Sequence, residues 1–200
     1  MKTNKELMLL QKESRDKFIP VIRKKTAKIL KKLIKNKKIN QILEIGTCVG
    51  FSGSLMLTTN KSAFLTTIDK DKEVLKIADE NFKKFEVDSR ATIICDDAIN
   101  AISRLEISDS KFDFILLDGP KGQYVKYMPH LISMLNVNGI LFADDVLFYN
   151  LVEKEGKIIH KHRTIVTNLR KFIDEMKNNK NFKCKLKRIE DGFMICKKVR

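Results

Sequence analysis

Strand-like apolar runs alternate with helix-like stretches along most of this chain, and this alternation constrains the fold more than any other feature. Five short runs rich in Ile, Leu and Phe have the composition of buried strands: 41–46, 63–69, 91–97, 112–118 and 139–145. Helix-like stretches lie between them: about 51–58, 71–85, 98–105 and 123–135. Strands that alternate with helices predict a parallel sheet with helices on both faces.

The end of the pattern is different. Residues 164–177 read as an amphipathic helix, and two further apolar runs follow at 182–189 and 192–199. Glu190 and Asp191 separate these runs, with Gly192 just beyond them, which predicts a β-hairpin. The predicted fold class is therefore α/β, with seven mostly parallel strands and a C-terminal antiparallel hairpin. We expect one domain over residues 1–200, with the first 40 residues packing on its core as helices.

The composition excludes several classes of protein. No run of about 18 apolar residues is present, so no membrane span is expected. The first 18 residues carry charges throughout and lack the apolar core of a signal peptide. The four cysteines have no CxxC spacing, which argues against structural zinc and predicts separate, mostly buried thiols in a reducing cytoplasm.

The formal net charge of +15 is the strongest compositional signal. Residues 23–38 hold nine basic residues and no acidic one, on a helix pattern with one apolar face. Such an excess favours contact with nucleic acid, although a general bias toward lysine would also produce it.

A glycine-rich segment joins the first strand to the first helix. In "LEIGTCVGFSG" (43–53) the spacing of Gly46, Gly50 and Gly53 fits neither the dinucleotide loop G-x-G-x-x-G nor a P-loop. The second strand ends in Asp69, where a carboxylate can accept hydrogen bonds from ribose hydroxyls. Asp97 and Ala98 after the third strand are placed to flank an adenine edge. Together these features predict a nucleoside cofactor without a diphosphate, and S-adenosylmethionine is the obvious candidate.

Carboxylates also end the fourth and fifth strands. Asp118 follows one strand, and Asp144 and Asp145 end the next. Because parallel strands end at the same edge of a sheet, these side chains should converge, and three carboxylates together favour a bound cation such as Mg²⁺. The alternative interpretation is that they form turns or cap helices. Lys121, three residues after Asp118, is either a general base or the partner of Asp118 in a surface ion pair.

Two motifs resemble a known family. "LEIGTCVGFSG" is similar to motif I of class I S-adenosylmethionine-dependent methyltransferases, which have a Rossmann-like fold. "DGPKGQY" (118–124), with Asp144 and Asp145, resembles metal-dependent O-methyltransferases of the catechol and caffeoyl-CoA type. The resemblance implies Mg²⁺ or Mn²⁺ on Asp118, Asp144 and Asp145, with Lys121 as general base. It places S-adenosylmethionine on these residues: Glu44, Gly46, Thr47, Gly50, Ser52, Asp69, Asp97, Ala98 and Asp118.

One position departs from the family pattern, since Asp145 stands where the family usually has asparagine, which leaves the choice of metal open. "DGPKGQY", "DDVLFYNLV" (144–152) and "HRTIVTNLRKF" (162–172) are similar to the bacterial tRNA 5-hydroxyuridine O-methyltransferases. This branch implies the anticodon loop of tRNA as substrate, and the wider family implies a homodimer.

The surroundings of the metal pair leave further alternatives open. Phe148 and Tyr149 either stack on a base, line the pocket or form a dimer contact. The basic residues 160–163 are placed to contact phosphates, after an insertion at 153–159 that is either a lid or a solvent loop. The alternative substrates are a small catechol-like phenol and a caffeoyl-CoA-type thioester. A non-catalytic, basic RNA-binding protein is the alternative of another class.

Overall fold

The computed structural model describes residues 2–35 and 38–200, and the chain forms two compact units, Met1–Ala101 and Ile102–Arg200. The expectation of one domain over residues 1–200 stays a prediction. Of the lysine-rich segment 23–38, Asn36 and Lys37 lie outside the described residues. In the described part of the chain, no helix has the length and apolarity needed to cross a membrane.

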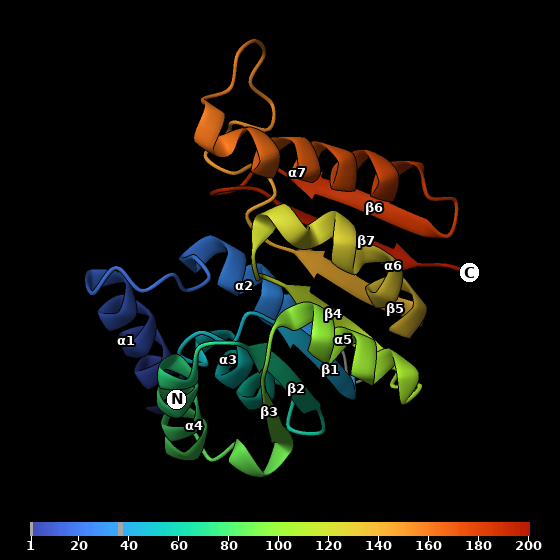
Figure 1. The fold of residues 1–200 in the computed structure, drawn as a ribbon. Coiled ribbons are helices and arrows are strands. Elements are labelled where there is room, and N and C mark those ends of the chain that lie inside the picture. Colours follow the sequence, from blue (N-terminus) through green and yellow to red (C-terminus); the bar gives the residue numbers. More distant parts are fainter. Residues whose placement is uncertain (1, 36–37) are drawn as a thin grey trace. The chain divides into compact units, whose positions relative to one another are not determined.

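The first unit is built on three parallel strands in the order β3-β2-β1. Its helices α1, α2 and α4 all contact α3 (Figure 1). The helices are α1 (Lys2–Asp16), α2 (Lys24–Ile34), α3 (Phe51–Thr59), α4 (Lys72–Lys84) and the start of α5 (Ala98–Ile107). The strands are β1 (Gln41–Ile45), β2 (Phe64–Asp69) and β3 (Ala91–Cys95), with a 3-10 turn η1 (Asp88–Arg90) before β3.

Local chemistry explains several of these elements. In α2, Leu30 and Ile34 are buried one turn apart, so the apolar face predicted for this segment is confirmed. Asp71 caps α4, because its side chain accepts hydrogen bonds from the backbone N–H groups of Glu73 and Val74. Arg90 donates hydrogen bonds to three carbonyl oxygens at the end of α3 and in the loop before β2. These bonds hold that loop against the start of β3.

The second unit has four strands in the order β4-β5-β7-β6. β4 (Phe112–Leu117) and β5 (Leu135–Ala143) are parallel, whereas β7 (Phe193–Lys198) is antiparallel to both β5 and β6 (Phe182–Lys187). The 3-10 turn η2 (Lys121–Gln123) leads into α6 (Tyr124–Met134), which contacts β4. The helix α7 (His160–Asn178) runs alongside β6 (Figure 1). The predicted fold class, with mostly parallel strands and a C-terminal antiparallel hairpin, is confirmed.

The starts of two elements lie well before their predicted positions. The strand β5 begins at Leu135 rather than at residue 139, because Leu135 already pairs with Phe112 of β4, and Asn138 between the two paired stretches has a left-handed φ of 69°. The helix α7 begins at His160 rather than at residue 164. Its first turn carries no buried residue, so no apolar periodicity marked it in the sequence.

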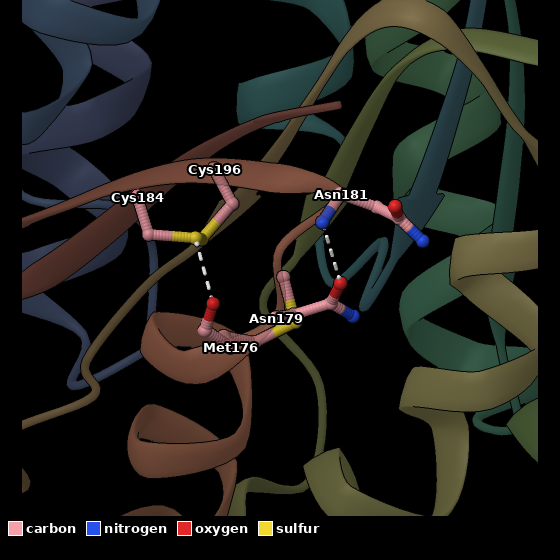
Figure 2. The surroundings of a disulfide bond; sticks show 5 residues. All are labelled: Met176, Asn179, Asn181, Cys184 and Cys196. Carbon is pink, nitrogen blue, oxygen red and sulfur yellow. Dashed lines mark hydrogen bonds between the residues drawn. A yellow bond between two sulfur atoms is a disulfide. The ribbon is translucent and has the colours of Figure 1, made fainter. Parts of the chain in front are cut away.

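The expectation of separate cysteine thiols is wrong for two of the four residues. Cys184 and Cys196 form a disulfide, with their Cα atoms 4.1 Å apart (Figure 2). They lie directly opposite each other in β6 and β7, where the side chains of an antiparallel pair are close enough to bond. The carbonyl oxygen of Met176 in α7 lies 3.3 Å from Cys184 Sγ. Cys48 and Cys95 are not part of this disulfide, and Cys95 is exposed rather than buried.

Candidate active site

The glycine loop of the first unit begins where β1 ends. Gly46 has a φ of 101° and Gly50 a φ of 75°, values that glycine adopts more readily than other residues. A Cβ atom at Gly53 would lie 2.7 Å from Leu65 Cδ2 and 2.9 Å from the ring of Phe82. Close packing therefore requires glycine at position 53, whereas the positive φ of the backbone favours glycine at positions 46 and 50.

A buried carboxylate organises this loop. Glu44 is fully buried and accepts hydrogen bonds from Ser52 Oγ (2.5 Å) and Thr67 Oγ1 (2.6 Å). Thr47 Oγ1 lies 2.7 Å from Thr67 Oγ1, so the network extends to the turn of the loop. The structure brings Glu44, Thr47 and Ser52 together as predicted, and these bonds hold the loop in place. That they also contact a cofactor stays a prediction.

Sequence reasoning missed Thr67. It occupies the centre of β2, next to Glu44 in the register of β1, and its side chain is fully buried. A threonine in a buried strand usually has only a packing role. The one signal for Thr67 was Glu44 on the neighbouring strand, because a buried carboxylate needs hydrogen-bond donors.

Two acidic residues follow β2 and β3 at the same edge. Asp69 Oδ2 accepts a hydrogen bond from the backbone N–H of Cys48 (3.0 Å), which ties the end of β2 to the glycine loop. Asp97 is exposed and accepts from the N–H of Ile99 (3.1 Å) at the start of α5, where Ala98 is the first residue. Each carboxylate has further acceptor capacity for hydroxyl or amino groups. These hydrogen-bond acceptors fit the hydroxyl and amino groups of a nucleoside.

The second unit brings the three predicted metal ligands together. One carboxylate oxygen from each of Asp118, Asp144 and Asp145 lies within 4.8 Å of the others. The backbone N–H of Asp144 donates to the carbonyl oxygen of Leu117 (3.0 Å), so the ends of β4 and β5 meet as expected for parallel strands. Asp145 has a φ of 52°, in the left-handed region. Consecutive side chains of an extended strand point to opposite faces, and this change of backbone direction lets Asp144 and Asp145 approach the same point.

The environment of Asp144 disfavours a negative charge. This residue is 3% exposed, whereas the side chains of Asp118 and Asp145 are 19% and 30% exposed. Burial, and then the charges of Asp118 and Asp145, raise the pKa of Asp144 to about 8. A divalent cation among the three oxygens would offset both causes, so the donor set fits a hard metal ion.

Lys121 lies against this group. Its Nζ atom is 2.5 Å from Asp118 Oδ1 and 3.8 Å from Asp145 Oδ2, and its side chain is 16% exposed. Burial disfavours the ammonium, but Asp118 and Asp145 outweigh this effect and raise the pKa of Lys121 well above its ordinary value. The ion pair with Asp118 is therefore present, in a partly buried setting rather than on the open surface.

Tyr124, the last residue of the "DGPKGQY" motif, supports the carboxylate group. Its buried hydroxyl donates toward the carbonyl oxygens of Leu117 (2.9 Å) and Asp144 (3.1 Å). This joins the ends of β4 and β5 beneath the carboxylates. Lys121 Nζ lies 5.6 Å from the centre of the Tyr124 ring.

An aromatic cluster follows the metal ligands. The ring of Phe148 lies 5.0 Å from that of Tyr149 and 5.4 Å from that of His162. Phe148 is partly buried, whereas Tyr149 is 67% exposed. The backbone N–H of Tyr149 donates to Asp191 Oδ1 (2.6 Å), which anchors this loop on the turn between β6 and β7.

The basic residues predicted near this loop form the first turn of α7. His160, Lys161 and Arg163 are exposed there, and no acidic residue shares the turn. The structure thus places positive charge beside the aromatic cluster, since His162 of the same turn contacts Phe148.

Comparisons with known proteins agree with these features. The O-methyltransferase family model matches residues 4–199. A caffeoyl-CoA O-methyltransferase from Populus kitakamiensis is 26% identical over 177 residues, which cover 86% of this chain and 75% of that protein.

Two solved structures share the fold. The O-methyltransferase from Bacillus cereus, in complex with SAH, superposes with a TM-score of 0.83 at 18% identity, covering 99% of this chain and 91% of that one. The O-methyltransferase TomG from Streptomyces achromogenes, involved in tomaymycin synthesis and in complex with SAM, gives a TM-score of 0.85 at 17% identity, covering 97% and 89%.

Proposed function

Because this chain belongs to the O-methyltransferase family, we propose that it methylates the 5-hydroxyl of 5-hydroxyuridine in tRNA with the help of a divalent metal ion. The chain is an S-adenosylmethionine-dependent O-methyltransferase of the caffeoyl-CoA type. The observation that carries the metal-dependent chemistry is the group formed by Asp118, Asp144 and Asp145 with Lys121.

We propose that the three carboxylates hold Mg²⁺ or Mn²⁺. The ion would supply a positive charge that orients two adjacent acceptor oxygens and lowers the pKa of the hydroxyl among them. Asp145 contributes a negative charge where the related enzymes usually have a neutral amide. The site is therefore more acidic, which favours a hard divalent ion.

The first unit would hold S-adenosylmethionine, which supplies the methyl group. Asp69 is proposed to accept hydrogen bonds from the ribose hydroxyls, and Asp97 to accept one from the adenine. Glu44 is proposed to act through Ser52 and the loop, because its side chain is fully buried and accepts hydrogen bonds from Ser52 and Thr67.

Lys121 is proposed to take the proton of the acceptor hydroxyl at Nζ. In the structure this atom is bound to Asp118, and its raised pKa keeps it protonated. The role as base therefore requires that Asp118 be engaged by a cation, which would remove the main cause of the raised pKa. Partial burial of Lys121 would then favour its neutral form.

The choice of tRNA rests on charge and on the aromatic cluster. The formal net charge is +15, and the exposed basic residues at the start of α7 lie next to Tyr149 and Phe148. A base displayed in a single-stranded loop can stack on an exposed aromatic ring while basic side chains contact its phosphates. The O4 and 5-hydroxyl oxygens of 5-hydroxyuridine are adjacent, as are those of a catechol.

A small phenol or phenolic thioester is the second candidate. The similarity to a caffeoyl-CoA O-methyltransferase favours it, and the same carboxylate group would serve either acceptor. The two candidates differ in what surrounds the reacting oxygens. An RNA acceptor requires the basic residues near the site, whereas a small phenol does not.

The test is methyl transfer from labelled S-adenosylmethionine to three acceptors: tRNA containing 5-hydroxyuridine, catechol, and caffeoyl-CoA. We expect label in tRNA as 5-methoxyuridine, its loss with a chelator, and its loss in Lys121→Ala. The matched control is Lys126→Ala, an exposed lysine in α6. Label confined to the small acceptors would refute the tRNA assignment, and transfer that survives the chelator would refute the metal.

A further inference from the structure

The outer strand of the C-terminal hairpin carries a row of lysines on one face. Side chains alternate along β6, and Lys183, Lys185 and Lys187 are all exposed. Cys184 lies between the first two on the opposite face, toward Met176 of α7 (Figure 2). Lys197 of β7 is exposed too and lies directly across from Lys183, on the same face as the other three. We call these four residues the β6 lysine row.

The charges of this row are uncompensated. Within the described residues, none of the four lysines forms an ion pair or a hydrogen bond through its side chain. Successive members along β6 are about 6–7 Å apart, because alternate residues of a strand share a face. Like charges at that spacing repel each other, so the row is a concentrated patch of positive potential.

The row starts at the edge of the unit that bears the metal ligands. Lys187 pairs with Phe193, and the next residue, Met194, pairs with Ala143 of β5. Asp144 follows Ala143 directly. Since β7 alone separates β5 from β6, the row lies two strand spacings, about 10 Å, to one side of the carboxylates and leads away from them.

We propose that the β6 lysine row binds the phosphate backbone of the RNA substrate, so that a nucleotide at the carboxylate group is held by its neighbours in the strand. This inference rests on the proposed tRNA substrate and adds the surface that recognises it. Charge complementarity selects the partner: an unpaired lysine row suits a polyanion with regularly spaced charges and repels a second copy of the same face. Lysines on an edge strand also discourage sheet-to-sheet aggregation, and that role predicts no effect on RNA binding.

The experiment measures the salt dependence of tRNA binding for the full chain. The test variant is Lys183→Gln/Lys185→Gln/Lys187→Gln. The control, Lys72→Gln/Lys76→Gln/Lys83→Gln, removes the same charge from α4, where Lys76 and Lys83 are paired with Glu73 and Asp79. Each lost phosphate contact lowers the slope of log K against log[salt] by about 0.7–0.9, so we expect a loss of about 2–3 in the test variant. The control should keep nearly the wild-type slope.

Two results would overturn the proposal: an unchanged slope in the test variant, or an equal change in both variants, which would mean that only net charge matters. Binding of wild type to vesicles of anionic lipid, but not to tRNA, would also overturn it in favour of a membrane surface. An unchanged unfolding midpoint, and unchanged methyl transfer to free 5-hydroxyuridine, would show that the test variant is folded.

The two proposals fail in different ways. If tRNA is not methylated but still binds through the row, the proposed acceptor is wrong and the surface stands. If the test variant methylates tRNA as efficiently as wild type at physiological salt and shows the wild-type salt slope, the surface is wrong and the acceptor stands.

Discussion

Replacing Asp144 by asparagine should stabilise the metal-free protein at neutral and alkaline pH while abolishing its response to metal. The pKa of Asp144 is raised from an ordinary value of 3.8 to about 8, by burial and then by Asp118 and Asp145, with Lys121 opposing them. Between about pH 4 and pH 8 the folded state holds a proton that the unfolded state has lost. Raising the pH through this window therefore destabilises the fold.

The size of this pH effect on stability follows from the binding of one proton. A single group of this kind changes the free energy of unfolding by up to about 1.4 kcal/mol per pH unit inside its window. Asparagine is nearly the same size and cannot ionise, so Asp144→Asn lacks this contribution. From pH 5 to pH 7, the free energy of unfolding of the variant should therefore rise by about 2–3 kcal/mol relative to that of wild type.

Urea unfolding at several pH values, in chelator and in excess Mg²⁺, measures both effects. We expect Mg²⁺ to stabilise wild type and to leave Asp144→Asn nearly unchanged, because the ion compensates the charge that the variant no longer has. Asp174→Asn, on an exposed position of α7, is the matched control and should follow wild type. If wild type and Asp144→Asn keep the same difference in free energy of unfolding from pH 5 to pH 8, the unfavourable burial of the Asp144 carboxylate is refuted. If Mg²⁺ stabilises the variant, the role of Asp144 as a metal ligand is refuted.

Three further changes test the packing around the sites. Gly53→Ala should cost about 1–3 kcal/mol, because the added methyl would lie 2.7 Å from Leu65; a thermal melt equal to wild type would contradict this. Tyr124→Phe removes a buried hydroxyl that joins two strand ends, which should cost about 1–2 kcal/mol and weaken Mg²⁺ binding in calorimetry; unchanged metal affinity would remove it from the site. Opening the Cys184–Cys196 disulfide with a reductant should lower the free energy of unfolding by about 2–3 kcal/mol, and equal urea curves with and without reductant would refute that contribution.

The sequence predicted the carboxylate group because parallel strands impose it. Once 112–118 and 139–145 were assigned as neighbouring buried strands, the aspartates that end them had to meet at one edge. The glycine loop was predictable for a similar reason, since a turn from strand to helix needs backbone freedom at Gly46 and Gly50. Both inferences depend on backbone geometry, which short apolar runs specify well.

Features that depend on side-chain partners were harder to predict. The disulfide had a signal in the sequence, because Glu190 of the predicted turn lies midway between Cys184 and Cys196. Judging each cysteine by its own apolar neighbours concealed that symmetry. The raised pKa of Lys121 was not predictable either, because it depends on the distances to Asp118 and Asp145, which only the folded unit defines.

The strand order of the second unit has a consequence for protein synthesis. The strand β7 lies between β5 and β6, although it is translated after both. On the ribosome, β6 has no partner in the sheet until Phe193–Lys198 has emerged and paired with β5. The loop that follows the metal ligands also waits for the hairpin, because Val146 and Leu147 donate hydrogen bonds to the carbonyl oxygens of Gly192 and Asp191. A nascent chain that stops before β7 would therefore already carry all three carboxylates, yet lack the strand and the turn that hold them in place.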